Sequence, residues 1–112
     1  MMHLIGDVKD KDAIVIDDMI DTAGTLVQAV SALEREGARR IIAGGVHAVL
    51  SGPAVGRIDQ SELDLIVVTD TIPLAPEARA SKRIRQLSVA ELLAETVRRI
   101  RAAESVSRLY LD

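Results

Sequence analysis

Residues 13–25 read AIVIDDMIDTAGT, an aliphatic run followed by acidic residues and a short polar loop. The run over residues 13–16 is mostly β-branched and stops at Asp17 and Asp18, as a buried strand stops at the carboxyl edge of a parallel sheet. From Thr25 onward the apolar residues recur with helical spacing. This stretch therefore predicts a strand, a loop and a helix in that order.

The predicted helix over residues 25–36 is amphipathic. Leu26, Val30 and Leu33 are spaced at i, i+4 and i+7, which places them on one face. Gly37 follows the charged end of the segment and suits the C-terminal cap, where a left-handed backbone is common. We expect the apolar face of this helix to pack on the sheet.

The remainder of the chain repeats the alternation of strands and helices. Its patterns predict strands over 41–50, 65–68 and 84–87, helices over 53–60 and 88–101, and a loop over 74–82. Pro76 is expected to break any helix in that loop, and Ser88 with Glu91 to form a capping box. The alternation predicts an α/β fold, a parallel sheet with flanking helices, as a single domain over residues 1–112.

The composition excludes several classes of function. Phe and Trp are absent and Tyr110 is the only aromatic residue among 112, so base-stacking platforms for nucleic acids are ruled out. The net charge of −3 also argues against a binder of nucleic-acid backbones. No cysteine is present, which excludes a disulfide framework, a thiolate metal site and a Cys nucleophile.

The sequence carries no sign of a membrane protein. No apolar run approaches the roughly 18 residues that span a bilayer, and residues 1–7 lack the layout of a signal peptide. We expect no membrane partner and a cytoplasmic location.

The loop after the first strand has the features of a phosphate site. In open parallel sheets, ligands bind beyond the carboxyl ends of the strands. Asp21, Thr22, Ala23, Gly24 and Thr25 turn the chain into a helix N-terminus, where free amides and the helix dipole favour a phosphate group. The alternative interpretation is that Asp21 or Thr22 only caps the helix.

Two further carboxylates precede this loop. Asp17 and Asp18 are neighbours in a strand and so point to different sides, and one of them is suited to accept hydrogen bonds from sugar hydroxyls. Because carboxylates repel a nearby phosphate, we expect Mg²⁺ between them, held mostly through the substrate. His47 is interpreted as a hydrogen-bonded core residue and Arg39-Arg40 as a solvated turn.

The string from Asp17 to Thr25 closely resembles the phosphoribosyl-pyrophosphate loop of phosphoribosyltransferases and ribose-phosphate pyrophosphokinases. The flanking matches favour the second family, over about residues 4–110. They are Gly6-Asp7-Val8, Ser51-Gly52-Pro53-Ala54, Thr69-Asp70-Thr71-Ile72-Pro73, Leu87-Ser88-Val89-Ala90 and Glu104-Ser105-Val106-Ser107-Arg108-Leu109. The resemblance implies a phosphoribosyltransferase-like fold and transfer of pyrophosphate from ATP to ribose 5-phosphate with Mg²⁺, for nucleotide biosynthesis.

The resemblance also implies roles for single residues. Residues 21–25 are expected to cradle the 5-phosphate of ribose 5-phosphate or phosphoribosyl pyrophosphate, and Asp17 and Asp18 to bind the ribose hydroxyls and their metal. Ser105 and Ser107 match serines of an inter-subunit regulatory phosphate site, with a frayed C-terminus as the alternative.

The match covers only the later part of the family's second domain. The domain that supplies most of the ATP site and the mobile Lys/Arg loop are missing, so we expect the chain alone to be inactive or nearly so. We also expect an uncovered apolar surface, and with it a homo-oligomer or pairing with a companion chain.

Three alternatives remain open at this point. One is a non-catalytic relative that binds sugar phosphate or regulates a full-length enzyme. Another is a response-regulator receiver domain, although Thr69 would then stand at the phosphoacceptor position. The third is an ordinary phosphoribosyltransferase, although no segment is available to build its nucleobase-binding hood.

Overall fold

A computed structural model describes residues 6–110 of the chain. Its secondary-structure elements follow in the order β1 (Asp12–Ile20), α1 (Gly24–Arg35), β2 (Arg40–Ala48), α2 (Ala54–Gln60), β3 (Leu65–Thr69), α3 (Pro76–Ala80), β4 (Ile84–Leu87), α4 (Ala90–Arg101) and the 3₁₀ helix η1 (Ser107–Tyr110). The strands form a four-stranded parallel sheet in the order β1-β2-β3-β4. The predicted α/β fold is confirmed.

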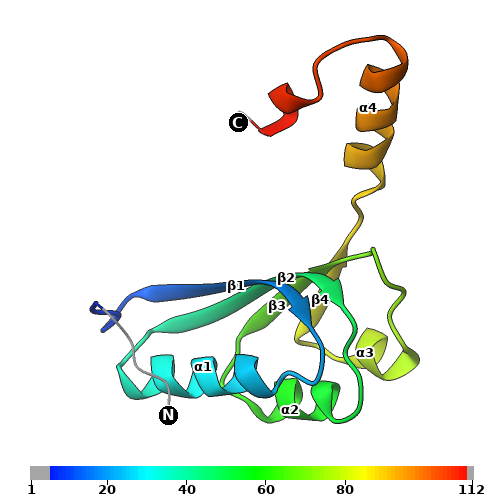
Figure 1. Ribbon diagram of the computed structural model, residues 1–112. Helices are drawn as coiled ribbons and strands as arrows, with labels where there is room; N and C mark the ends of the chain where they lie inside the picture. The colour runs from blue at the N-terminus through cyan, green and yellow to red at the C-terminus, as the bar shows by residue number, and fades with distance from the viewer. Residues whose placement is uncertain (1–5, 111–112) are drawn as a thin grey trace.

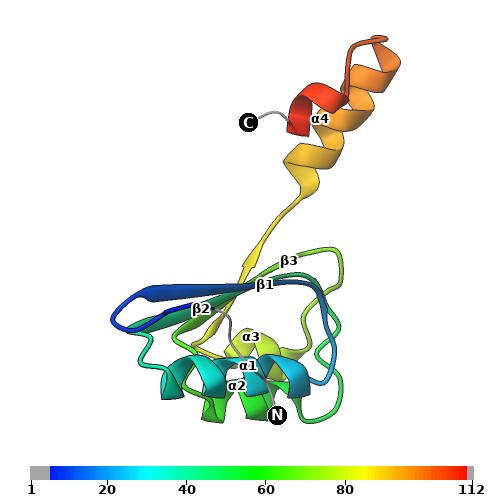
Figure 2. The same cartoon turned by 60° about the vertical axis from the view of Figure 1, so that its left-hand side comes forward.

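The sheet has helices on one face only within the described residues. Helices α1, α2 and α3 lie together beneath it, whereas α4 projects away on the other side (Figure 1, Figure 2). The core lies between the sheet and the first three helices, and Ile58, Leu63, Ile66, Val30 and Val68 are its largest fully buried side chains. Helices therefore cover one face of the sheet, as expected. The other face is the uncovered apolar surface that the sequence predicts.

Strand alternation explains which side chains reach the core. Val15 packs against the core, while its neighbours Ile14 and Ile16 are exposed. The same alternation runs through β2, where Gly45 lies on the core side. A Cβ at Gly45 would overlap Ile20 Cδ1, so the glycine leaves room for the buried Ile20 side chain.

Helix α1 begins and ends as the sequence indicates. Leu26, Val30 and Leu33 are buried against the core. Gly37 adopts φ +88°, and the amides of Gly37 and Ala38 donate to the carbonyls of Glu34 and Leu33, at 3.0 Å each. This pair of bonds is the Schellman motif that glycine favours at a helix C-terminus.

Several boundaries differ from the prediction. Strand β1 continues through Asp17 and Asp18 to Ile20, because it stays paired with β2 as far as Ala48. Helix α3 occupies part of the predicted loop, since Pro76 stands in its first turn, where a missing N–H costs nothing.

The predicted capping box at the start of α4 is wrong. The helix begins at Ala90 and has Val89 as its N-cap; the Ser88 hydroxyl accepts from the Ala90 amide at 3.1 Å, but within residues 6–110 Glu91 makes no reciprocal bond to Ser88. Asp70 holds the connection instead, since its Oδ1 accepts from the Val89 amide at 2.9 Å. Hydrogen bonds from the Ser88 side chain and the Val89 amide lower the pKa of Asp70. In the described part of the chain, no helix is long and apolar enough to cross a membrane.

Candidate functional site: a pocket at the start of helix α1

A pocket of about 160 Å³ lies at the carboxyl edge of the sheet, where β1 passes into α1. It is lined by Asp17, Met19, Ile20, Asp21, Thr22, Ala23, Gly24, Thr25 and Leu26. Six of the seven residues predicted to bind substrate therefore meet in one hollow. The seventh, Asp18, does not line it, as expected for a strand residue that alternates with Asp17.

The loop backbone presents the start of α1 to the pocket. Ala23 is the N-cap and has a left-handed backbone, with φ 65° and ψ 11°. Among the described residues, no side chain caps the helix, so Asp21 and Thr22 do not serve as caps and that alternative is wrong. The first-turn amides after Ala23 are left for solvent or a ligand, and the helix dipole favours an anion there.

Two residues outside the predicted set hold the loop in place. The Ser51 hydroxyl donates to Asp21 Oδ1, and the Ser51 amide donates to the Asp21 carbonyl at 3.0 Å. Arg57 of α2 donates from Nη1 to the Thr22 carbonyl at 3.0 Å. A Cβ added at Gly24 would come within 3.3 Å of the same Nη1. Arg57 thus lies directly beside the loop, and four of its five N–H donors remain available beyond that bond.

His47 lies at the same edge of the sheet and not in the core. It is half-buried in β2, and its Nδ1 lies 2.8 Å from Thr71 Oγ1. Thr69 Oγ1 donates to the Val46 carbonyl at 2.6 Å, which ties the end of β3 to β2. The prediction that His47 is hydrogen-bonded is confirmed, whereas its expected place in the core is wrong.

The residues at this edge suit a cation that is shared with a ligand. Within residues 6–110, no group of three or more His, Asp or Glu side chains is placed to hold a metal ion. Mg²⁺ commonly binds one or two carboxylates and completes its shell with water and substrate phosphates. Asp17 and Asp18 fit that pattern, since both are exposed at the end of β1.

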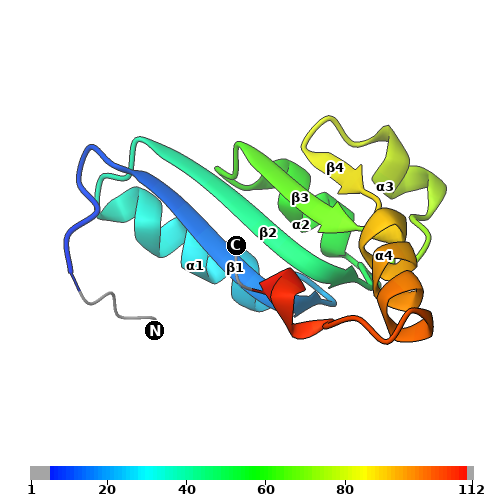
Figure 3. The ribbon, with the colours of Figure 1, turned by 90° about the horizontal axis from the view of Figure 1, so that it is seen from above.

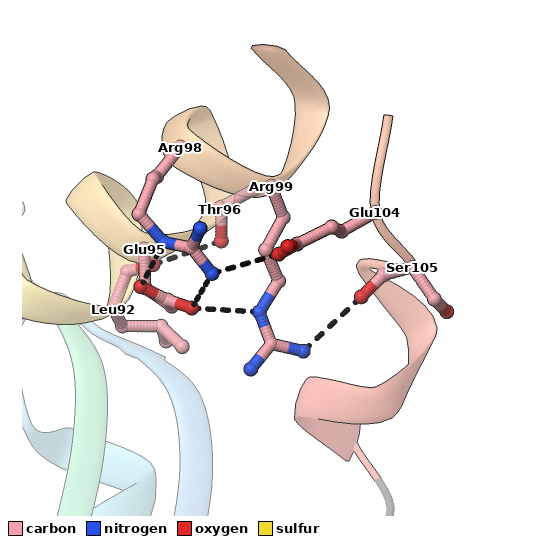
Figure 4. A network of polar contacts seen from close by, with 7 residues as sticks. All are labelled: Leu92, Glu95, Thr96, Arg98, Arg99, Glu104 and Ser105. Atoms are coloured by element: carbon pink, nitrogen blue, oxygen red, sulfur yellow. Dashed lines mark hydrogen bonds and ion pairs between the residues drawn. The ribbon is translucent and has the colours of Figure 1, made fainter. Parts of the chain in front are cut away.

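The C-terminal segment at Ser105 is held by a separate network of polar contacts (Figure 4). Arg99 Nη1 donates to the Ser105 carbonyl at 3.1 Å, and the hydroxyls of Ser105 and Ser107 lie 2.9 Å apart. The 3₁₀ helix η1 follows and begins at Ser107. A hollow beside it is lined by Arg99, Glu104, Ser105 and Arg108.

Glu95 is the central acid of this network. It accepts from Arg98 at 2.9 and 3.0 Å and from Arg99 at 2.8 Å, and Arg98 also donates to Glu104 at 2.8 Å. The hydrogen bonds from Arg98 and then Arg99 lower the pKa of Glu95 to about 2.

We predict a pH dependence of the Glu95 network. A carboxyl whose pKa falls on folding stabilises the folded state above its unfolded pKa, and this stabilisation is lost as the pH falls from about 4.5 to about 2. Carboxyl NMR titration should place the pKa of Glu95 at about 2, well below the usual range of a glutamate. Arg98→Ala should raise the pKa of Glu95, and a Glu95 titration near 4.5 in the unsubstituted chain would contradict this assignment.

Together, the fold and the pocket define an α/β protein with a small pocket where a strand passes through a loop into a helix N-terminus. Residues 1–111 match the family described as "Phosphoribosyl synthetase-associated domain". The chain is 58% identical to a ribose-phosphate pyrophosphokinase of Xanthomonas axonopodis pv. citri and 54% identical to that of Nitrosomonas europaea. Each alignment covers 100% of this chain and 35% of the relative.

A solved structure supports the same relationship. The crystal structure of phosphoribosylpyrophosphate synthetase from Mycobacterium smegmatis superposes with a TM-score of 0.83 at 39% identity, over 88% of this chain and 33% of that one. The chain therefore belongs to the ribose-phosphate pyrophosphokinase family and spans about a third of the length of the curated relatives it matches. This assignment replaces the receiver-domain and ordinary phosphoribosyltransferase alternatives.

Proposed function

We propose that this chain is a sugar-phosphate-binding unit that takes ribose 5-phosphate or phosphoribosyl pyrophosphate in the pocket at the start of α1. The observation that carries the proposal is the left-handed turn at Ala23, which leaves the first amides of α1 uncapped beside Thr22 and Thr25. A phosphate dianion accepts hydrogen bonds from such amides and hydroxyls and is stabilised by the helix dipole.

The acidic residues at the end of β1 indicate where the ribose of the ligand would bind. Asp17 lines the pocket and is suited to accept hydrogen bonds from ribose hydroxyls, while Asp18 points to the opposite face of β1. Mg²⁺ supplies the positive charge that offsets repulsion between these carboxylates and the phosphate groups. The ion would be held mostly through the ligand, with Asp17 and Asp18 as the carboxylates available to it at the end of β1.

We propose that pyrophosphoryl transfer from ATP requires protein beyond this chain. Charge on a transferring phosphoryl group is stabilised by cationic side chains and metal ions. Arg57 is the cationic side chain that contacts the loop among the described hydrogen bonds, and it already donates to the Thr22 carbonyl. One arginine beside the loop is too few cationic groups to bind the triphosphate of ATP as well as the 5-phosphate.

Calorimetry tests the binding and an assay tests the turnover. Ribose 5-phosphate should bind with one site per chain in the presence of Mg²⁺ and more weakly after chelation. ATP added to that complex should yield no phosphoribosyl pyrophosphate. Failure to bind ribose 5-phosphate and phosphoribosyl pyrophosphate would overturn the assignment of the pocket, whereas product formation would overturn only the assignment of the chain as inactive.

Arg57→Ala is expected to weaken ribose 5-phosphate binding by roughly tenfold, because the loop loses its hydrogen bond at the Thr22 carbonyl and the phosphate loses a neighbouring cation. Calorimetry gives the affinity, and thermal unfolding checks the fold. Arg79→Ala, which removes an exposed arginine from α3, is the matched control and should leave binding unchanged. Equal affinities for both variants would rule out a role of Arg57 at the site.

We further propose that Ser105 and Ser107, with Arg99 and Arg108, hold an inorganic anion that regulates the assembled enzyme. The Ser105 hydroxyl and the guanidinium groups of Arg99 and Arg108 line one hollow together with Glu104, and the Ser107 hydroxyl lies 2.9 Å from that of Ser105, which supports this assignment. Phosphate added to the chain should shift the amide NMR signals of residues 104–108. Arg108→Ala should abolish these shifts, and their persistence in that variant would contradict the proposal.

A further inference from the structure

The loop before α1 contains a negative charge that is able to compete with a bound phosphate. Asp21 stands two residues before the N-cap Ala23 and three residues before Gly24. At this separation an aspartate side chain commonly accepts hydrogen bonds from the following amides, and a carboxylate at a helix N-terminus is stabilising. The carboxylate of Asp21 is therefore suited to occupy the same amides that an anionic ligand would use.

In the structure, the Asp21 carboxylate is turned to a neighbouring loop instead. The Ser51 hydroxyl donates to Asp21 Oδ1, and the Ser51 amide donates to the Asp21 carbonyl at 3.0 Å. Among residues 6–110, no side chain caps α1, so the carboxylate of Asp21 leaves the first amides of the helix open. Ser51 thus holds both the side chain and the backbone of Asp21.

Ser51 reaches Asp21 because β1 and β2 end at the same edge of the sheet. The two strands run side by side in the same direction (Figure 3), and Ile20 at the end of β1 pairs with Ala48 at the end of β2. The loops that follow these strands therefore leave the sheet next to each other.

The turn after β2 is shaped around the end of β1. The amides of Val49 and Leu50 both donate to the Ile20 carbonyl, at 3.0 and 3.1 Å. Leu50 is buried and has a left-handed backbone with φ 50°, which is unfavourable for a leucine and persists only where surrounding contacts maintain it. These contacts fix the turn and place Ser51 beside Asp21.

The same contacts set the direction of the loop amides. The Asp21 carbonyl accepts from the Ser51 amide, and the Thr22 carbonyl accepts from Arg57 Nη1 at 3.0 Å. In a trans peptide the carbonyl and the next amide point in opposite directions. The amides of Thr22 and Ala23 therefore point away from Ser51 and Arg57. The pocket lies on that side, since its lining comes from β1, the loop and α1 and not from β2 or α2.

We propose that Ser51 is a positioning residue that keeps the pocket open to an anion, by holding the Asp21 carboxylate away from the first amides of α1. Without the Ser51 hydroxyl, the carboxylate rotates to accept from the amides of Ala23 and Gly24 and competes with the phosphate of the ligand. The inference rests on the proposed function for its ligand, ribose 5-phosphate, whereas the movement of Asp21 needs no ligand.

Hydrogen-exchange NMR on the ligand-free chain tests the movement of Asp21. In Ser51→Ala, exchange of the Ala23 and Gly24 amides with water should slow by roughly fivefold, because these amides gain an acceptor. Ser51→Thr keeps the hydroxyl and should exchange like the original chain. Adding Asp21→Ala to Ser51→Ala should restore the original rate. Unchanged or faster exchange in Ser51→Ala would overturn the proposal.

Calorimetry with ribose 5-phosphate and Mg²⁺ tests the consequence for binding. Ser51→Ala should weaken binding by roughly tenfold. In the Asp21→Ala background, the same substitution should change the affinity by less than about twofold, because Ser51 acts through Asp21. An equal loss in both backgrounds would overturn the proposal, since a general loosening of the loop does not depend on the carboxylate.

A matched control removes a similar hydrogen bond elsewhere. The Ser81 hydroxyl donates to Asp59 Oδ1 at 2.6 Å, outside the pocket. Ser81→Ala should leave both the exchange of the loop amides and the affinity unchanged, and circular dichroism confirms that each variant is folded. Changes in Ser81→Ala equal to those in Ser51→Ala would overturn the specific role of Ser51.

The two measurements distinguish this inference from the proposed function. If the original chain bound no ribose 5-phosphate but exchange slowed in Ser51→Ala, the ligand assignment would be overturned and Ser51 would still be the group that directs Asp21. If the original chain bound the ligand and Ser51→Ala changed neither exchange nor affinity, the role of Ser51 would be overturned and the proposed function would stand.

Discussion

Thr25→Asp is expected to abolish ribose 5-phosphate binding while making the protein more stable. Thr25 is exposed in the first turn of α1, where an acidic side chain stabilises a helix by about 0.3–1 kcal/mol. The same carboxylate takes the place of the phosphate at the free amides and repels it. We expect affinity to fall on the order of 100-fold, equal to about 2.7 kcal/mol, in calorimetry with Mg²⁺ present.

Two control variants distinguish a specific effect at the phosphate site from a general effect of negative charge on α1. Gln28→Glu adds the same charge one turn further along α1 and should leave the affinity within about twofold, because the dipole effect is confined to the first turn. Thr25→Ser keeps the hydroxyl and should bind nearly as well as the original chain. If Thr25→Asp bound ribose 5-phosphate normally, the phosphate would lie elsewhere.

The strand, loop and helix at the site could be predicted because short-range patterns determine them. The β-branched run before Asp17 and the helical spacing of Leu26, Val30 and Leu33 depend only on local sequence. Gly37 was predictable for the same reason, since its left-handed backbone serves a local cap. The roles of Asp17 and residues 21–25 as ligands stay predictions, although the pocket brings these residues together.

Contacts between distant segments could not be predicted. Arg57 is 35 residues from Thr22 in sequence, and no local pattern distinguishes it from the other exposed arginines. The end of β1 was placed too early, because pairing with β2 holds Asp17 and Asp18 in the sheet despite their low strand propensity. The stripe on α4 indicated a buried face, yet burial depends on a partner that local sequence does not supply.

Ile58→Ala is expected to destabilise the protein by about 3 kcal/mol, within the range of 2–5 kcal/mol for large-to-small changes in a core. Ile58 is fully buried, and α2 is only seven residues long, so the helix depends on tertiary packing and not on its own propensity. One face of the sheet is open within residues 6–110. The core that buries Ile58 therefore lies entirely on the face that the helices cover. Urea unfolding should show a midpoint lower by roughly 2 M.

The same substitution links stability to the site. Ile58 and Arg57 are neighbours on α2, so loosening of this helix should also release the Thr22 carbonyl and weaken ribose 5-phosphate binding. Val49→Ala removes a similar side chain from a half-exposed position and should cost less than about 1 kcal/mol. Shortening a side chain leaves a destabilising cavity only where the side chain is well packed. An equal loss of unfolding free energy in the two variants would therefore mean that α2 does not anchor the core.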